Sequence, residues 1–138
     1  MANMANGEFI DAAYKTGAGR YLQGATALDQ LGGEVARLGK KAFVVAGPNG
    51  WRVAGERAAA SLESANVPFC VEVCDCPTSY EAARRLADAA SAAGCDAVVG
   101  VGGGRVMDLA KAVAATAAGR WRRRPRALLR ALRSRRFP

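Results

Sequence analysis

Three consecutive glycines, Gly102 to Gly104, form the part of this sequence best suited to bind a ligand. They follow a short apolar, β-branched run and precede a helical pattern, which places them at a strand-to-helix turn. Backbone without side chains can close on a ligand, and the first amides of the next helix point outward at the positive end of its dipole. The turn therefore suits a phosphate or pyrophosphate group. The alternative is that the glycines only tighten the turn.

The glycine turn matches neither of the two common phosphate-binding motifs. In the dinucleotide motif G-x-G-x-x-G, Arg105 stands where the last glycine belongs, and the Gly-Lys-Ser/Thr of the P-loop is absent from the chain. Nor does the turn follow the first predicted strand, where the ordinary dinucleotide motif lies. The residues by themselves therefore indicate an anion-binding turn without identifying its ligand.

The residue types exclude several kinds of catalysis. The chain has no histidine, which removes the commonest general base and the Ser/His and Cys/His pairs of many hydrolases. Its four cysteines are too few and too unevenly spaced for a disulfide framework, so we expect them to be reduced. Cys74 and Cys76, with Cys70 nearby, could suggest a soft-metal site, but thiols buried on a strand are the favoured interpretation.

The length of 138 residues, with 51% apolar residues, is that of one domain with enough apolar side chains for a core. The N-terminal residues lack the basic and apolar regions of a secretory signal. No run approaches the roughly 18 apolar residues of a membrane span. We therefore expect a soluble, cytoplasmic protein without a membrane partner.

Strand and helix patterns alternate along the chain. Apolar spacing predicts helices over residues 26–38, 53–65 and 106–118, and a capping-box pattern at Thr78 to Glu81 predicts a helix that ends at Gly94. Strands are predicted over residues 41–46, 69–74 and 96–101. This order predicts an α/β fold with a doubly wound parallel sheet, covered on both faces. The glycine turn then lies at the carboxyl edge of the sheet, where such folds bind ligands.

The positive charge of the chain belongs to its last residues. Residues 1–119 contain 11 basic and 12 acidic residues, whereas the last 19 residues contain nine arginines and no acid. We favour the interpretation that residues 119–138 are a non-native or disordered tail, produced by a frameshift in a GC-rich gene. Two alternatives remain: an arm that binds nucleic acid through phosphate contacts, and an amphipathic helix on a membrane surface.

The segment from Gly100 to Ala112, G-V-G-G-G-R-V-M-D-L-A-K-A, resembles the G-G-G-S/K-x-x-D-x-A-K segment of the iron-containing alcohol dehydrogenase and glycerol dehydrogenase superfamily. Residues 21–24 and 38–45 are similar in order and spacing to the start of glycerol dehydrogenase, and residues 96–99 match its approach to the glycine turn. The resemblance covers about residues 21–118. It implies a lead-in over residues 1–20 and a partial, Rossmann-like dinucleotide-binding domain over residues 21–118.

The resemblance implies an NAD-linked oxidoreductase that moves a hydride between a nicotinamide and the carbinol carbon of a small alcohol or polyol. In that family a separate C-terminal domain supplies aspartate and histidine ligands to zinc or iron, and the enzymes are homo-oligomers. This chain offers no histidine ligand and only part of the cofactor cleft. We therefore expect no catalytic residue in it and no activity from it alone, with the dinucleotide and an alcohol as the partners of the intact protein.

The resemblance also assigns roles to individual residues. Gly103 and Gly104, next to Gly102, match backbone that cradles the pyrophosphate. Arg105 stands where glycerol dehydrogenases have lysine, and its guanidinium can pair with a phosphate oxygen. Asp108 lies in the first helical turn, where we expect its carboxylate to cap exposed amides. Gly47 replaces an acidic residue that hydrogen-bonds the adenosine ribose, so the choice between NAD and NADP stays open.

The frameshift hypothesis makes a prediction about the gene. Restoring the reading frame near Gly119 should reveal an apolar strand followed by a Thr/Ser-rich segment, as in the resembled family. Translating the downstream nucleotides in all three frames tests this expectation. Finding no such segment in any frame would refute the hypothesis.

Overall fold

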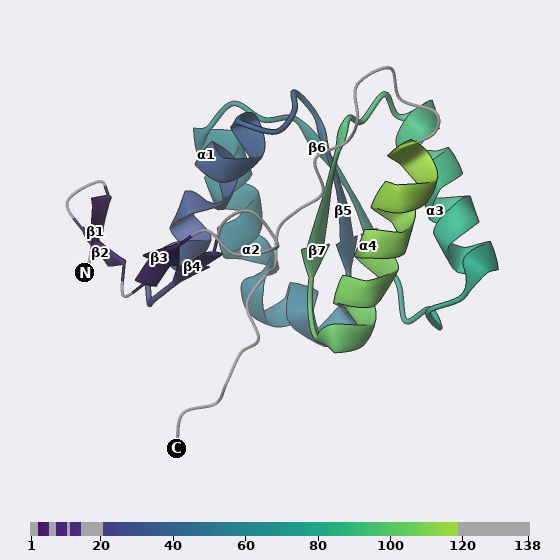
Figure 1. The fold of residues 1–138 in the computed structure, drawn as a ribbon, viewed down its shortest axis with the longest axis horizontal. Coiled ribbons are helices and arrows are strands. Elements are labelled where there is room, and N and C mark those ends of the chain that lie inside the picture. Colours follow the sequence, from purple (N-terminus) through teal and green to yellow (C-terminus); the bar gives the residue numbers. More distant parts are fainter. Residues whose placement is uncertain (1–2, 6–7, 11, 15–20, 119–138) are drawn as a thin grey trace.

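The computed structural model describes residues 3–5, 8–10, 12–14 and 21–118 (Figure 1). Short antiparallel pairs, which the sequence did not predict, occupy the N-terminal part: β1 (Asn3–Ala5) with β2 (Glu8–Ile10), and β3 (Ala12–Tyr14) with β4 (Tyr21–Gln23). The remaining elements follow in the order η1 (Ala27–Gln30), α1 (Leu31–Ala36), β5 (Ala42–Ala46), α2 (Pro48–Ser64), β6 (Phe69–Val73), α3 (Tyr80–Ala92), β7 (Ala97–Val101) and α4 (Gly104–Ala118).

Within the described residues, the main sheet has three parallel strands, with β5 between β6 and β7. The register pairs Ala42 of β5 with Phe69 on one side and Ala97 on the other, so the three strands start and end together. Helices α1 and α2 cover one face of the sheet, and α3 and α4 cover the other (Figure 1). The predicted doubly wound α/β fold is therefore confirmed.

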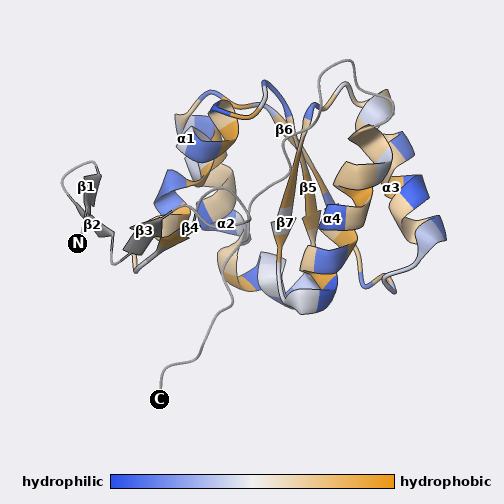
Figure 2. Cartoon of the chain, viewed as in Figure 1, coloured by the Kyte–Doolittle hydropathy of each residue, from blue (hydrophilic) through white to orange (hydrophobic). Residues whose placement is uncertain are grey.

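Two apolar clusters form the core, one on each face of the sheet. Side chains that alternate along β5 separate into the two clusters: Val44 packs beneath α1 and α2, whereas Phe43 and Val45 pack beneath α3 and α4. Figure 2 shows apolar colours on the strands and hydrophilic residues on the outer side of α3. Every residue of β5 and β7 is buried because helices cover both faces, as expected for a parallel sheet.

Helices α1 and α2 contact each other through a buried hydroxyl group. Ser61, which is 7% exposed, accepts a hydrogen bond from the amide of Gly32 (2.9 Å) and donates one to the carbonyl of Asp29 (2.8 Å). A β-carbon at Gly32 would collide with the backbone of Ser61, so only glycine allows this approach. The hydroxyl group thus links η1 and α1 to α2.

Three predicted helix boundaries were wrong. The residues expected to form one helix over 26–38 divide into η1 and α1. The helix expected at residue 53 starts at Pro48, because proline fits the first helical position, where no amide donor is needed. The cap of α3 is Ser79, whose Oγ accepts from the amide of Ala82 (3.1 Å), and not Thr78.

None of the helices in the described part of the chain combines the length and apolar composition that a membrane span requires.

We predict that Ser61→Ala lowers the free energy of unfolding by about 1–3 kcal/mol, because it leaves the buried amide of Gly32 and the partly buried carbonyl of Asp29 without their partner. Urea denaturation followed by circular dichroism measures the loss. Ser64→Ala, on the exposed end of the same helix, is the matched control and should change stability by less than about 0.5 kcal/mol. Equal losses in the two variants would contradict the role of the Ser61 hydroxyl.

Candidate functional site

The carboxyl ends of β5 and β7 lie side by side at one edge of the sheet (Figure 1). From this edge the chain continues from β5 into α2 on one face and from β7 into α4 on the opposite face. Adjacent parallel strands whose connections diverge in this way leave a crevice that binds ligands in open α/β sheets. The predicted glycine turn, between β7 and α4, lies at this crevice.

The three glycines have different roles in the turn. Gly102 has φ +152°, a backbone conformation that residues with side chains rarely adopt, and a β-carbon there would lie 3.0 Å from Cγ2 of Val106. Gly103 and Gly104 are exposed, and a β-carbon added at either would have no atom within 4 Å. Packing therefore requires glycine only at Gly102, whereas the other two leave open space in front of their backbone.

The amides at the start of α4 are available to a ligand. The first hydrogen bond of the helix runs from the amide of Met107 to the carbonyl of Gly103 (3.0 Å). In the described part of the chain, no backbone carbonyl accepts from the amides of Gly103, Gly104 and Arg105. Such donors at a helix start attract anions, and the helix dipole adds to that attraction.

The turn between β5 and α2 lies next to the glycine turn at this edge of the sheet. The amide of Gly47 donates to the carbonyl of Val101 (3.1 Å), and the carbonyl of Gly47 accepts from the amide of Trp51 (2.9 Å). A β-carbon at Gly50 would lie 2.8 Å from the α-carbon of Gly102. The start of α2 is therefore in close backbone contact with the turn that precedes α4.

Arg105 joins the crevice to the loop that follows β6. Its exposed guanidinium lies 4.0 Å from a carboxylate oxygen of Asp75, and its carbonyl accepts from the hydroxyl of Thr78 (3.2 Å). The side chain is 71% exposed, so the contact with Asp75 holds it only weakly. Arg105 can thus turn toward an anion in front of the glycine turn.

The expected capping role of Asp108 was wrong. Its carboxylate is 66% exposed and lies 3.9 Å from Nζ of Lys111, one turn along the same helix. Helix α4 starts at Gly104, so Asp108 is its fifth residue and lies outside the first turn, where the cap was expected. Among the described residues, Asp108 makes no hydrogen bond to the amides that it was expected to cap.

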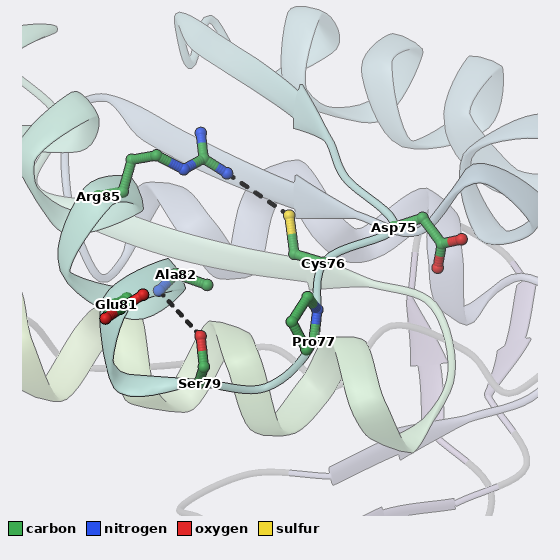
Figure 3. Close-up of a pocket in the computed structure, with 7 residues that line it drawn as sticks. All are labelled: Asp75, Cys76, Pro77, Ser79, Glu81, Ala82 and Arg85. Carbon is green, nitrogen blue, oxygen red and sulfur yellow. Dashed lines mark hydrogen bonds between the residues drawn. The ribbon is translucent and has the colours of Figure 1, made fainter.

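A pocket of about 450 Å³ lies between the loop after β6 and the start of α3 (Figure 3). Its lining includes Asp75, Cys76, Ser79 and Arg85, and none of the predicted cofactor residues. In this loop the sulfur atoms of Cys74 and Cys76 lie against each other. Within the described residues, no group of three or more His, Cys, Asp or Glu side chains could hold a metal ion.

The family model for iron-containing alcohol dehydrogenases matches residues 18–134 of the chain. The chain belongs to this family. Among curated relatives, the glycerol dehydrogenases of Thermotoga maritima, Pseudomonas putida and Citrobacter freundii are 39%, 34% and 33% identical over 97, 96 and 94 residues. These matches cover 68–70% of this chain but 26% of each relative, so the chain spans about a quarter of their length.

Solved structures of alcohol dehydrogenases have the same fold. An archaeal halo-thermophilic alcohol dehydrogenase from a Red Sea brine pool gives a TM-score of 0.62 at 33% identity, covering 68% of this chain and 24% of that one. The NADH-dependent butanol dehydrogenase A of Thermotoga maritima gives 0.62 at 26% identity, covering 68% and 25%. The resemblance found in the sequence is confirmed. The nucleic-acid alternative gains no support, and the tail on which it depended lies outside the described residues.

Gly47 and Val106 provide a test of how closely the two turns pack. A β-carbon at Gly47 would lie 2.9 Å from Cγ2 of Val106, so we predict that Gly47→Ala lowers the free energy of unfolding by about 1–3 kcal/mol. Val106→Ala should cost about 1 kcal/mol by itself but make room for the new methyl group. Urea denaturation of both single variants and the double variant measures the coupling. Strictly additive losses would show that the two turns do not pack as described.

Proposed function

We propose that residues 21–118 are the NAD(P)-binding part of a metal-dependent alcohol or polyol dehydrogenase. The proposed reaction transfers a hydride from the carbinol carbon of a small alcohol to the nicotinamide. Membership of the iron-containing alcohol dehydrogenase family and the glycerol dehydrogenase relatives support this proposal. The observation that carries it is the open glycine turn, with free amides at a helix start beside the crevice of the sheet.

In the proposed complex the amides of Gly103, Gly104 and Arg105 donate to the pyrophosphate oxygens. Gly102 supplies the conformation that turns these amides outward. The guanidinium of Arg105 leaves Asp75 and pairs with a phosphate oxygen, because a doubly charged pyrophosphate attracts it more strongly than one exposed carboxylate does. Asp108 is not among these proposed contacts, since its negative charge would oppose the anion.

Gly47 lies on the adenosine side of the proposed site. It presents no carboxylate to the ribose hydroxyls, and the methyl group of Val106 fills the space where a side chain at this position would start. An acidic residue in this role would exclude the 2′-phosphate of NADP by charge repulsion. We therefore propose that the site accepts NAD and NADP without strong discrimination.

The bound nicotinamide supplies the hydride acceptor, and the described residues bind and orient the dinucleotide. The family implies zinc or iron, but the described residues do not fit such an ion, so we assign no step of the reaction to a metal here. We place the ligands of that metal, the alcohol site and the oligomer contacts of the proposed enzyme outside the described residues. The cytoplasm is its proposed location.

We predict that Gly103→Ala weakens NADH binding about tenfold or more without lowering the melting temperature. The new methyl group meets no atom within 4 Å in the free protein but would occupy the space of the pyrophosphate. Quenching or enhancement of NADH fluorescence measures the affinity, and thermal denaturation measures stability.

Gly33→Ala is the matched control, because a β-carbon there also meets no atom within 4 Å and α1 lies away from the crevice. It should leave NADH affinity unchanged. Equal affinity in the Gly103 variant, the Gly33 variant and the parent chain would overturn the proposed site, and so would the absence of measurable NADH and NADPH binding to the parent chain.

A further inference from the structure

The loop after β6, residues 74–79, contacts the first turn of α4, which lies much later in the chain. The hydroxyl of Thr78 donates to the carbonyl of Arg105, 27 residues further along (3.2 Å). A carboxylate oxygen of Asp75, in the same loop, lies 4.0 Å from the guanidinium of Arg105. One loop therefore contacts both the backbone and the side chain of the residue that follows the glycine turn.

Helix α3 does not use the hydroxyl of Thr78 as its cap. The N-cap of α3 is Ser79, whose Oγ accepts from the amide of Ala82, as Figure 3 shows. The capping-box pattern of the sequence singled out Thr78, but the structure gives its hydroxyl a partner on a different helix. The function of this hydroxyl must therefore be sought at α4.

The backbone of this loop is held at both ends. At its start, the amide of Cys74 donates to the carbonyl of Ala46, the last residue of β5 (2.8 Å). At its end, Ser79 caps α3. Between these points Pro77 has a fixed φ angle and also restricts the residue before it. A loop with so little freedom can serve as a fixed support for Thr78.

The first turn of α4 has few other contacts that fix it. Its first backbone hydrogen bond is donated by Met107, and the ends of helices fray where such bonds are missing. Val106 packs against the turn before α2, since a β-carbon at Gly47 would lie 2.9 Å from its Cγ2. The hydrogen bond from Thr78 to Arg105 adds a second attachment, from the loop after β6.

We propose that Thr78 is a positioning residue of the dinucleotide site, an inference that rests on the proposed function. Its hydroxyl holds the carbonyl of Arg105 and so restricts the first turn of α4, which carries the amides that donate to the pyrophosphate. The guanidinium of Arg105 stays free to turn toward the anion, because its contact with exposed Asp75 is weak. The loop thus fixes the backbone of Arg105 and leaves its side chain mobile.

The test replaces Thr78 in the full chain. Thr78→Val removes the hydroxyl and keeps the branched shape, and it should raise the dissociation constant of NADH about threefold, because an exposed neutral hydrogen bond contributes modestly. Inorganic pyrophosphate, measured by displacement of NADH, should lose affinity by the same factor, since the amides contact only that part of the dinucleotide. Thr78→Ser keeps the hydroxyl and should bind both ligands as the parent chain does. NADH fluorescence measures the affinities.

Thr116→Val is the matched control, because the hydroxyl of Thr116 also donates to a backbone carbonyl, that of Ala112 (2.8 Å), near the far end of α4. It should leave both affinities unchanged. If the parent chain binds NADH and the two valine variants bind it equally well, the role of Thr78 is overturned and the proposed function stands. A loss of affinity that Thr78→Ser shares would also overturn this role, since the hydroxyl would not be its cause. A parent chain that binds neither NADH nor NADPH would overturn the proposed function and this inference with it.

Discussion

The close approach of two strand-to-helix turns at the carboxyl edge of the sheet is the constraint on which the proposed site depends. The turn after β5 and the turn after β7 touch through their backbones, since a β-carbon at Gly50 would lie 2.8 Å from the α-carbon of Gly102. Helices α2 and α4 leave this edge toward opposite faces of the sheet, and no described backbone carbonyl accepts from the amides of Gly103, Gly104 and Arg105. Unsatisfied donors at a helix start lose little while water reaches them, and they bind an anion when one is present.

The fold could be predicted from the sequence because helices bury both faces of the sheet, and burial leaves a clear apolar pattern in the strands and helices. The strand from Ala42 to Ala46 is a continuous apolar run, typical of a strand that is buried on both sides, and the helices between the strands have apolar residues at helical spacing. These patterns depend on burial, which acts over the whole element. Boundaries depend on single residues instead. Pro48 lies outside the helix predicted over residues 53–65 although it fits the first helical position, and Thr78 was taken for a cap that Ser79 provides.

The candidate site could be predicted only in part, and the reason is again physical. Glycines between a buried strand and a helix indicate an open backbone by themselves, so the turn at Gly102 to Gly104 could be located from the sequence. Its surroundings are made by contacts between distant residues. The hydroxyl of Thr78 bonds the carbonyl of Arg105, and the pairing of Asp108 with Lys111 depends on where α4 begins.

The central claim concerns the amides of Gly103, Gly104 and Arg105, and amide chemical shifts report on them directly. Titrating the ¹⁵N-labelled chain with inorganic pyrophosphate, followed by two-dimensional NMR, tests whether an anion binds there without any contribution from adenosine or nicotinamide. Our account predicts saturable shift changes that are largest at these three amides. Changes that are largest in the pocket residues around Arg85, with the glycine turn unaffected, would contradict it.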